Sequence, residues 1–186
     1  MKLLSIETSC DETSLAIIAS SNGRKTKTLS HITNSQADLH AQYGGVFPAM
    51  AKREHTKNLL PLVFASLQEA GLLERRARPI ELEQKTMKKI RAILEREPDL
   101  AELVIAIGQQ YRTSKIDAIA VTYGPGLEIA LWTGFNVARA LSVLLDCTLV
   151  PVNHMEGHIY SSLFESDTIQ PLTIPALAVL ISGGHT

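Results

Sequence analysis

Residues 3–19 read LLSIETSCDETSLAIIA, and this stretch decides the fold class of the chain. Two short apolar runs, residues 3–6 and 15–19, flank eight residues that carry acidic, hydroxyl or thiol side chains. Apolar runs of this length on either side of a polar connection predict two antiparallel strands. Asn22-Gly23 is a strong turn signal, and it predicts a third strand near residues 27–33. The chain is therefore expected to begin with three consecutive antiparallel strands.

The last third of the chain alternates strands and helices. Residues 116–123 form a buried type of apolar run that ends in Gly124-Pro125-Gly126. We expect a helix to about residue 145, a strand over residues 148–152 and then another helix. This alternation predicts βαβ units that extend the sheet with parallel strands. The predicted fold class is α/β, with a mixed sheet flanked by helices.

Helices are also predicted between these two parts. Pro48 suits the first turn of a helix that should end at Gly71, with a kink or break near Asn58 because Pro61 lies inside it. Residues 74–112 are predicted to be an inserted pair of helices, divided at Pro98-Asp99. The apolar stripes of the two helices are Met87, Ile90 and Leu94, and then Leu100, Leu103, Val104, Ile107 and Tyr111.

Residues 75–96 of this insertion carry a local excess of positive charge. Eight Lys or Arg stand there against three Glu, whereas the whole chain has 18 Lys or Arg against 19 Asp or Glu. The near-neutral total excludes a globally basic nucleic-acid-binding protein. A solvated helix face is one interpretation of the local excess, and a contact with a phosphate backbone is the other.

Composition is typical of a soluble globular protein. Apolar residues make up 45% of the chain, and only two cysteines occur, so no disulfide framework is expected. The apolar run at the start meets Glu7 too soon for a signal peptide. No apolar run approaches the roughly 20 residues of a membrane span. We expect a cytoplasmic protein with no membrane association.

His154 and His158 are the clearest candidate site. Their spacing puts both imidazoles on one face of the predicted helix, about one turn apart, where one divalent ion could contact both. The pair follows a predicted strand, and α/β sites open at the carboxyl ends of strands. Met155 stands where a zinc protease motif requires Glu, which disfavours proteolysis. No third ligand is evident, and surface or core histidines are the alternative interpretation.

Two turns carry further candidate residues. Thr8-Ser9-Cys10-Asp11-Glu12-Thr13 is either an ordinary capped turn or a phosphate and magnesium site, with Asp11 or Glu12 near the cation. Ser182-Gly183-Gly184-His185-Thr186 follows a strand predicted over residues 176–181. It is either a tight turn or a backbone cradle for phosphate or carbonyl oxygens.

Other conspicuous residues receive structural interpretations. Cys10 has no histidine near it in sequence and is interpreted as a small turn residue. Trp132 and Phe135, at helical spacing, are predicted to be core rather than base-stacking residues. Gly124-Pro125-Gly126 is expected to shape the backbone beside the cleft.

Six ordered motifs resemble one known family. They are IETSCDET (6–13), LHAQYGGVFP (39–48), REH (53–55), GPGL (124–127), NHMEGH (153–158) and SGGHT (182–186). Together they closely resemble the tRNA N6-adenosine threonylcarbamoyltransferase (TsaD) family, formerly described as a glycoprotease. The motifs span nearly the whole chain.

The resemblance implies an actin-like, sugar-kinase-like ATPase (ribonuclease H-like) fold of two lobes around a cleft. Residues 1–165 would form the N-terminal lobe, with a helical insertion at about 74–112. Residues 166–186 would be a linker and the first strand of a truncated C-terminal lobe. The family transfers a threonylcarbamoyl group from threonylcarbamoyl-adenylate to N6 of the adenosine beside the anticodon, in tRNAs that read codons beginning with A. The 186 residues alone are expected to be inactive.

The resemblance also implies roles for individual residues. His154 and His158 would hold one divalent ion, iron or zinc, with the third ligand outside this chain. Asp11 and Glu12 would be catalytic, handling a proton or holding a cation, and magnesium could accompany a nucleotide. The substrate-binding segment would be Leu180, Ile181, Ser182, Gly183 and Gly184. The implied partners are tRNA, threonylcarbamoyl-adenylate, a paralogous TsaB-like scaffold subunit and a TsaE-like ATPase subunit.

Two alternatives stay open. A non-catalytic scaffold subunit of the same complex (TsaB-like) would share the fold but has no need of two stacked imidazoles. A sugar-kinase-like ATPase would place a glycine- and threonine-rich turn where Ser9-Cys10-Asp11-Glu12 stands. The metal content of the full-length protein tests the first alternative, and phosphorylation of a sugar tests the second.

Overall fold

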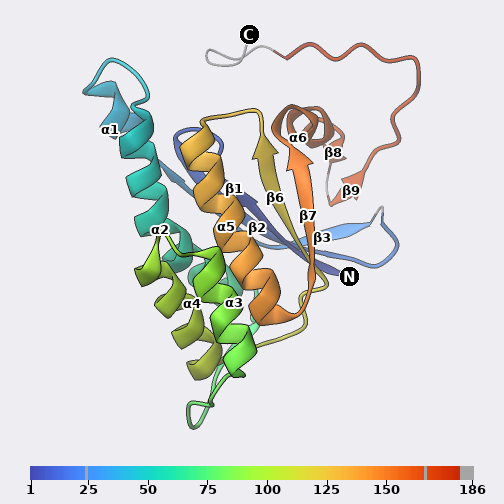
Figure 1. Ribbon diagram of the computed structural model, residues 1–186. Coiled ribbons are helices and arrows are strands. Elements are labelled where there is room, and N and C mark those ends of the chain that lie inside the picture. Colours follow the sequence, from blue (N-terminus) through green and yellow to red (C-terminus); the bar gives the residue numbers. More distant parts are fainter. Residues whose placement is uncertain (24, 166, 181–186) are drawn as a thin grey trace.

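A five-stranded mixed sheet organises the computed structural model, which describes residues 1–23, 25–165 and 167–180. The strand order is β3-β2-β1-β6-β7 (Figure 1). The first three strands pair antiparallel, and the last two extend the sheet in parallel, as predicted. Their bounds are β1 Lys2–Glu7, β2 Glu12–Ser20, β3 Thr26–Ser35, β6 Ala118–Gly124 and β7 Thr148–Asn153. The expected α/β lobe with a mixed sheet flanked by helices is confirmed.

Side-chain alternation explains the pairing of the first hairpin. Leu4 lies opposite Ile17 and Ile6 lies opposite Leu15, and all four are at most 2% exposed. This period of two sends one face of both strands into the core. The central strand β6 is instead buried continuously over residues 118–122, as expected for a strand with neighbours on both edges and helices against it.

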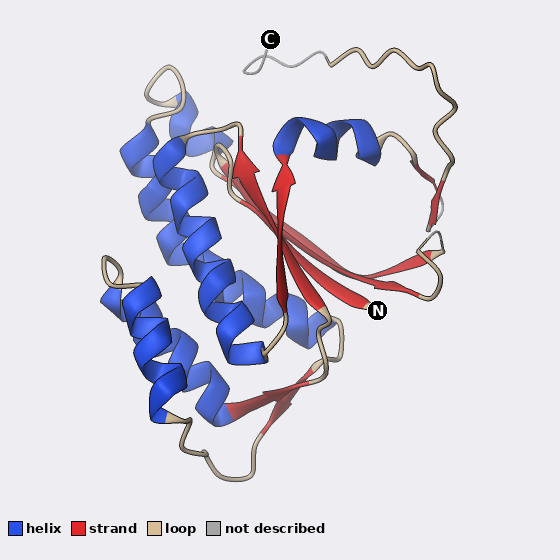
Figure 2. Cartoon of the chain, turned by 45° about the vertical axis from the view of Figure 1, so that its right-hand side comes forward, coloured by secondary structure: helices blue, strands red, loops and turns tan. Residues whose placement is uncertain are grey.

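Four long helices form two layers beside the sheet (Figure 2). α2 (Pro48–Glu69) and α5 (Glu128–Leu145) pack directly on the strands and on each other. α3 (Gln84–Ile93) and α4 (Pro98–Gln110) pack outside them, and confirm the predicted pair of helices. Two short strands that the sequence did not predict, β4 (Leu73–Arg75) and β5 (Tyr111–Thr113), pair at the base of the insertion. A short α1 (Ala37–Ala41) was not predicted either.

The helix α2 is continuous through Pro61, so of the predicted kink or break near Asn58 the break is wrong, and the kink stays a prediction. A proline inside a helix costs about 3 kcal/mol, because it removes a backbone donor and crowds the preceding turn. Leu59, Leu60 and Val63 are at most 2% exposed. Burial of each such side chain contributes roughly 1.5–3 kcal/mol, which together exceeds the cost of the proline.

Two side chains predicted to be core are exposed. Leu103 of α4 is 50% exposed and Trp132 of α5 is 52% exposed. The buried face of α5 includes Ala130, Gly134 and Val137, and Trp132 lies about 200° around the helix from Ala130. Phe135 is half-buried and packs against the core, as predicted.

Among the described residues, α5 alone has the length and apolar composition of a membrane span. It covers the sheet at β6 and is itself packed against α2, α3 and α4. Its buried residues face this core, which is the ordinary position of an apolar helix in a globular lobe.

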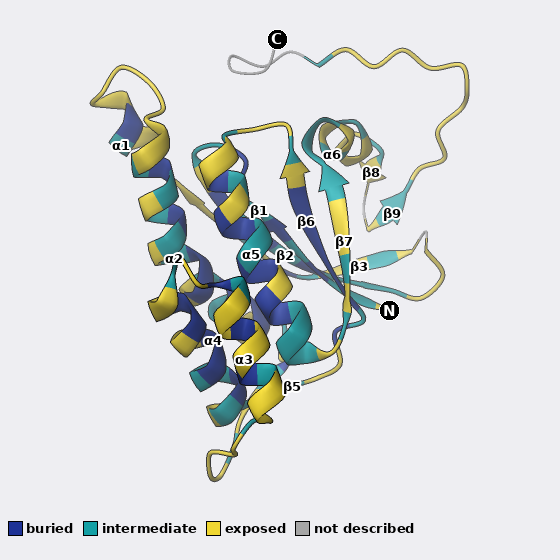
Figure 3. Cartoon of the chain, viewed as in Figure 1, coloured by how far each residue is buried: buried dark blue, intermediate teal, exposed yellow. Residues whose placement is uncertain are grey.

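The chain leaves the sheet after α6 (His154–Ser161). The short strands β8 (Phe164–Glu165) and β9 (Thr168–Ile169) pair with each other, and residues 170–179 then run as an exposed segment (Figure 3). The strand predicted over 176–181 is wrong for 176–180, because a strand needs a neighbour and these residues lie beside none that the structure describes. Leu177 and Val179 are 91% and 70% exposed. The domain boundary near residue 165 stays a prediction.

Candidate functional site

Helix α6 carries His154 and His158 on one face, with their side chains in contact. The side chain of Asn153 caps the helix, because its Oδ1 accepts hydrogen bonds from the backbone N–H groups of Met155 and Glu156 at 2.8 and 3.3 Å. The Nε2 atoms of His154 and His158 lie 3.1 Å apart, and the two rings are inclined at 85°. The four-residue spacing therefore brings both imidazoles together, as predicted.

The distance between the two Nε2 atoms suits one shared metal ion. Two nitrogens that each lie about 2.0–2.1 Å from one tetrahedral or octahedral ion are roughly 2.9–3.4 Å apart. The observed 3.1 Å falls within this range, and it is also the length of a hydrogen bond between the two rings. Within residues 1–180, the described part of the chain contains no group of three or more His, Cys, Asp or Glu that could hold a metal. The described residues thus contain two candidate ligands at this position and no third.

The carboxylate of Glu7 contacts Nδ1 of His154, the ring nitrogen that does not face His158. Its Oε2 lies 3.3 Å from Nδ1 of His154 and also accepts a hydrogen bond from the hydroxyl of Thr122, while its Oε1 accepts from the backbone N–H of Ser9. A histidine that binds a metal usually donates its other ring nitrogen to a carboxylate, which fixes the tautomer. Burial raises the pKa of Glu7, but the hydrogen bonds from Ser9 and Thr122 outweigh it and leave this pKa below its usual value.

No individual role for Glu7 was predicted from the sequence. One feature could have indicated such a role: Glu7 is an acidic residue at the end of an otherwise apolar strand. Sites in α/β proteins open at this carboxyl end of the strands. Its partner His154 lies 147 residues later, and only the strand order brings the two together.

The loop between β1 and β2 is held between the histidines and α5. The hydroxyl of Ser9 lies 3.2 Å from Nδ1 of His154, and the Ser9 carbonyl accepts a hydrogen bond from the backbone N–H of Leu127 at 2.7 Å. The buried hydroxyl of Thr8 donates to the carbonyl of Ala130 at 3.0 Å. The first turn of α5 therefore positions a loop that touches the candidate metal centre.

Two glycines make this close approach possible. A Cβ at Gly126 would lie 2.5 Å from the carbonyl oxygen of Ser9, and one at Gly134 would collide with the side chain of Thr8. Gly126 also has φ +155°, a conformation that L side chains rarely adopt. The predicted backbone-shaping role of Gly124-Pro125-Gly126 is confirmed at Gly126.

Asp11 and Glu12 lie at the other end of the same loop. Asp11 is half-buried, and its backbone carbonyl accepts a hydrogen bond from the N–H of Gln36 at 2.8 Å. Glu12 is the first residue of β2 and is exposed. The loop thus carries Ser9 at the histidines and two carboxylates shortly after it. The catalytic roles of Asp11 and Glu12 stay predictions.

A buried polar network holds this loop to α2. His55, at 0% exposed, donates from Nε2 to the carbonyl of Cys10 at 3.0 Å and accepts at Nδ1 from the hydroxyl of Thr13 at 2.8 Å. The amide of Gln36 lies 3.5 Å from the same Nδ1, and its Oε1 accepts from Nε2 of His40 at 3.1 Å. Burial lowers the pKa of His55, which favours the neutral ring that these bonds require.

His55 belongs to the motif Arg53-Glu54-His55, but its supporting role was not predicted from the sequence. The available signal was a histidine four residues before Leu59, on the apolar face of a predicted helix. Cys10 contributes its backbone carbonyl rather than its thiol. Burial and the neighbouring Asp11 raise the pKa of that thiol, which agrees with its interpretation as a turn residue.

The predicted substrate-binding segment falls almost entirely outside the described residues. Leu180 is described and is half-buried. Ile181, Ser182, Gly183 and Gly184 lie beyond the described part of the chain, so their role stays a prediction.

One protein-family model matches most of the chain. The model of the family TsaD, tRNA N6-adenosine threonylcarbamoyltransferase, matches residues 27–78 and 98–186. The chain belongs to the TsaD family. Within the matched region, the model leaves out residues 79–97, which contain α3 and the turn after it. The added helix pair therefore includes a segment that the family model does not describe.

A curated relative agrees with this assignment. A tRNA N6-adenosine threonylcarbamoyltransferase from Thermomicrobium roseum is 37% identical over 189 aligned residues. The match covers 100% of this TsaD-family chain but only 40% of that relative. The chain thus spans about two fifths of the relative's length.

Solved structures with a similar chain include two from Pseudomonas aeruginosa. One is YeaZ, and the other is described as an uncharacterized protein with similarity to peptidase YeaZ. Their identities to this chain are 21% and 20%, with TM-scores of 0.41 and 0.42. Each match covers 82% of this chain and 43% of the other. A likeness at this level does not indicate a function.

Proposed function

We propose that the full-length protein modifies tRNA by transferring the threonylcarbamoyl group of threonylcarbamoyl-adenylate to N6 of the adenosine beside the anticodon. Membership of the TsaD family supports the reaction class. The observation that carries the proposal is the pair of Nε2 atoms 3.1 Å apart, with the carboxylate of Glu7 behind one ring. A scaffold subunit has no need of this arrangement.

The two histidines would hold one divalent ion, iron or zinc. Such an ion acts as a Lewis acid that polarises a carbonyl group. Glu7 would keep the ring of His154 in the orientation that directs Nε2 toward His158. We propose that the third ligand comes from a part of the protein outside these residues, which is why the 186 residues alone should be inactive.

The proposed reaction also requires a group that accepts a proton from the adenosine amine. When the adenosine amine attacks the threonylcarbamoyl carbonyl, the C–N bond forms, AMP leaves and the amine loses one proton. Asp11 or Glu12 would accept that proton, because their loop also touches the histidines through Ser9. Cytoplasmic location, magnesium with a nucleotide, and TsaB-like and TsaE-like partners remain part of the proposal.

The test is a tRNA modification assay with the full-length protein, scored by mass spectrometry of the digested tRNA. His154→Ala and His158→Ala should each lower the rate at least 100-fold and lower the bound metal. His31→Ala is the matched control, because this exposed histidine lies on β3, away from α6. Unchanged modification in both site variants would refute the metal role. Absence of both bound metal and transfer in the unaltered full-length protein would favour the scaffold alternative.

A further inference from the structure

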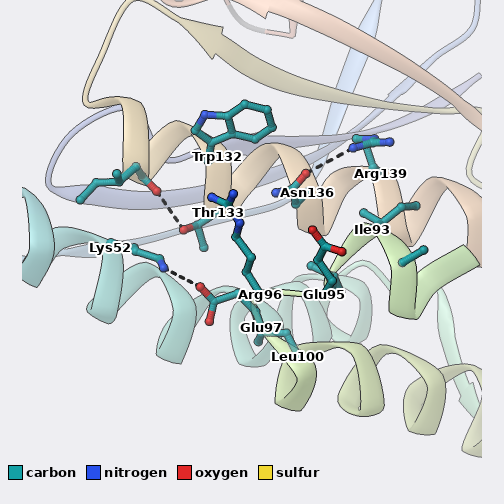
Figure 4. Close-up of a pocket in the computed structure, with 13 residues that line it drawn as sticks. Lys52, Ile93, Glu95, Arg96, Glu97, Leu100, Trp132, Thr133, Asn136 and Arg139 are labelled. Atoms are coloured by element: carbon teal, nitrogen blue, oxygen red, sulfur yellow. Dashed lines mark hydrogen bonds and ion pairs between the residues drawn. The ribbon is translucent and has the colours of Figure 1, made fainter.

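A pocket of about 360 Å³ lies on the helical side of the lobe, between α2, the α3–α4 turn (residues 94–97) and α5 (Figure 4). Lys52 of α2, Arg96 of the turn, and Trp132 and Arg139 of α5 are among its lining residues. The histidines of the candidate metal centre are on α6, so this pocket belongs to a different surface.

Three basic residues (Lys52, Arg96 and Arg139) and two acidic ones (Glu95 and Glu97) line this pocket, which leaves one net positive charge. Lys52 is neutralised by Glu97, with Nζ and Oε1 2.7 Å apart. Arg96 is exposed and extends from the turn toward α5 (Figure 4). Arg139 is also exposed, and its Nη1 makes only a 3.4 Å contact with Oδ1 of Asn136. Two arginines that face a pocket from opposite walls suit an anionic ligand.

The basic character continues along α3. Met87 and Ile90 are 7% and 0% exposed and face the core, whereas Lys85, Lys88 and Lys89 are exposed on the opposite side. Their spacing of three or four residues forms a stripe that runs toward the pocket. Since the whole chain has a net charge of −1, this concentration of lysines is a local feature.

One aromatic ring lines this pocket, and two more line the hollow beside it. Trp132 is 52% exposed, and it also lines a neighbouring hollow of about 240 Å³ with Tyr123 and Phe135. Tyr123 is 56% exposed, and the ring of Phe135 meets the indole edge-on at a centroid distance of 6.4 Å. Exposed aromatic rings beside arginines are the combination with which proteins bind single-stranded nucleic acid.

We propose that this surface, made of Trp132, Tyr123, Arg96, Arg139 and the exposed lysines of α3, binds a single-stranded segment of RNA. Phosphates would contact the arginines and lysines, and an unstacked base would lie on the indole of Trp132. The solvated-face interpretation accounts for the lysines but does not explain why an indole is exposed on the lining of the same pocket. The identity of the RNA as tRNA rests on the proposed function.

The first turns of α5 connect this surface to the candidate metal centre. Ile129 lines the pocket, while its neighbours Leu127 and Ala130 anchor the loop that brings Ser9 to His154. One helix therefore carries both the proposed RNA contact and the support of the candidate site. The local excess of eight Lys or Arg over three Glu in residues 75–96 favours a polyanion such as RNA over a protein as the occupant.

The experiment measures binding of a fluorescently labelled anticodon-loop RNA hairpin to the full-length protein, by anisotropy over a range of salt concentrations. Trp132→Ala should weaken binding about tenfold with an unchanged salt slope, because it removes stacking. Arg96→Gln should lower the salt slope by about 0.7, because it removes one phosphate contact. Lys27→Gln, an exposed lysine on β3, should change neither quantity. RNA affinity and slope unchanged in both surface variants would overturn the proposal.

The same variants separate this inference from the proposed function. A raised KM for tRNA with an unchanged kcat supports RNA binding at this surface. Efficient modification with an unchanged KM overturns the surface proposal and leaves the function intact. If no modification occurs but RNA affinity still depends on Trp132, the surface proposal stands and the function fails. Loss of a protein partner with RNA affinity intact assigns the surface to protein docking and overturns the proposal. Because both side chains are exposed, thermal unfolding should match that of the unaltered protein.

Discussion

The carboxylate of Glu7 lies 3.3 Å from Nδ1 of His154, although 147 residues separate them in the chain. Glu7 ends β1 and His154 follows β7, and both strands border β6, which contributes the hydroxyl of Thr122 to the same carboxylate. Three strand ends thus meet at one point. The carboxyl ends of parallel strands are the usual position of a site in an open α/β sheet.

Glu7→Gln tests whether this carboxylate supports a metal ligand. The amide keeps the shape of the side chain but loses the charge that holds Nδ1 of His154. Loss of such a supporting group typically weakens metal binding about 10–100-fold. We expect that decrease in a zinc or iron titration of the full-length protein. Glu69→Gln is the control, because this exposed residue ends α2, away from the site. Equal metal affinity in both variants would exclude the supporting role.

The pH dependence of stability should reveal the buried His55. Burial lowers its folded pKa below the ordinary value of 6.5. The unfolded chain therefore binds a proton at a higher pH than the folded chain. The stabilising contribution is complete above about pH 6.5 and is lost as the pH falls from there toward the folded pKa, by at most about 1.4 kcal/mol per pH unit.

Urea unfolding at several pH values measures this contribution. His55→Gln should flatten the pH dependence between about pH 6.5 and the folded pKa, because the amide does not titrate. His31→Ala removes an exposed histidine and should leave the dependence unchanged. An identical pH profile in His55→Gln would mean that another group causes the dependence.

Because the β1–β2 loop packs closely against α5, replacing one glycine of α5 should destabilise the lobe. Gly134→Ala should destabilise the lobe by about 1–3 kcal/mol, because the new methyl group meets the side chain of Thr8. Gly157→Ala is the matched control in another helix, because its Cβ would meet nothing within 4 Å. There we expect a small stabilisation of up to about 1 kcal/mol. Similar unfolding free energies for both variants would contradict the packing of Thr8 against α5.

Local patterns in the sequence predicted the elements, whereas contacts between distant elements could not be predicted. The alternation through Leu4 and Ile6 identified a strand, and the spacing of His154 and His158 identified a shared helix face. The bond from Glu7 to His154 depends on the order of strands in the sheet, which neither local sequence contains. Trp132 was misassigned because an apolar helix does not by itself indicate which of its faces a sheet will cover.

The insertion is predicted to be part of the folded core rather than a loosely attached arm. Ile90 of α3 is 0% exposed and belongs to the same apolar cluster as Val137 and Leu141 of α5. Ile90→Ala should therefore lower the free energy of unfolding by about 2–4 kcal/mol in urea titrations, since it leaves a cavity between the two helices. Leu103→Ala removes a leucine that is 50% exposed, and should cost no more than about 0.5 kcal/mol. Because the family model does not cover residues 79–97, an arm that folds independently is the competing expectation. It predicts that Ile90→Ala leaves the main unfolding transition unchanged, whereas an integral helix predicts one transition shifted to lower urea.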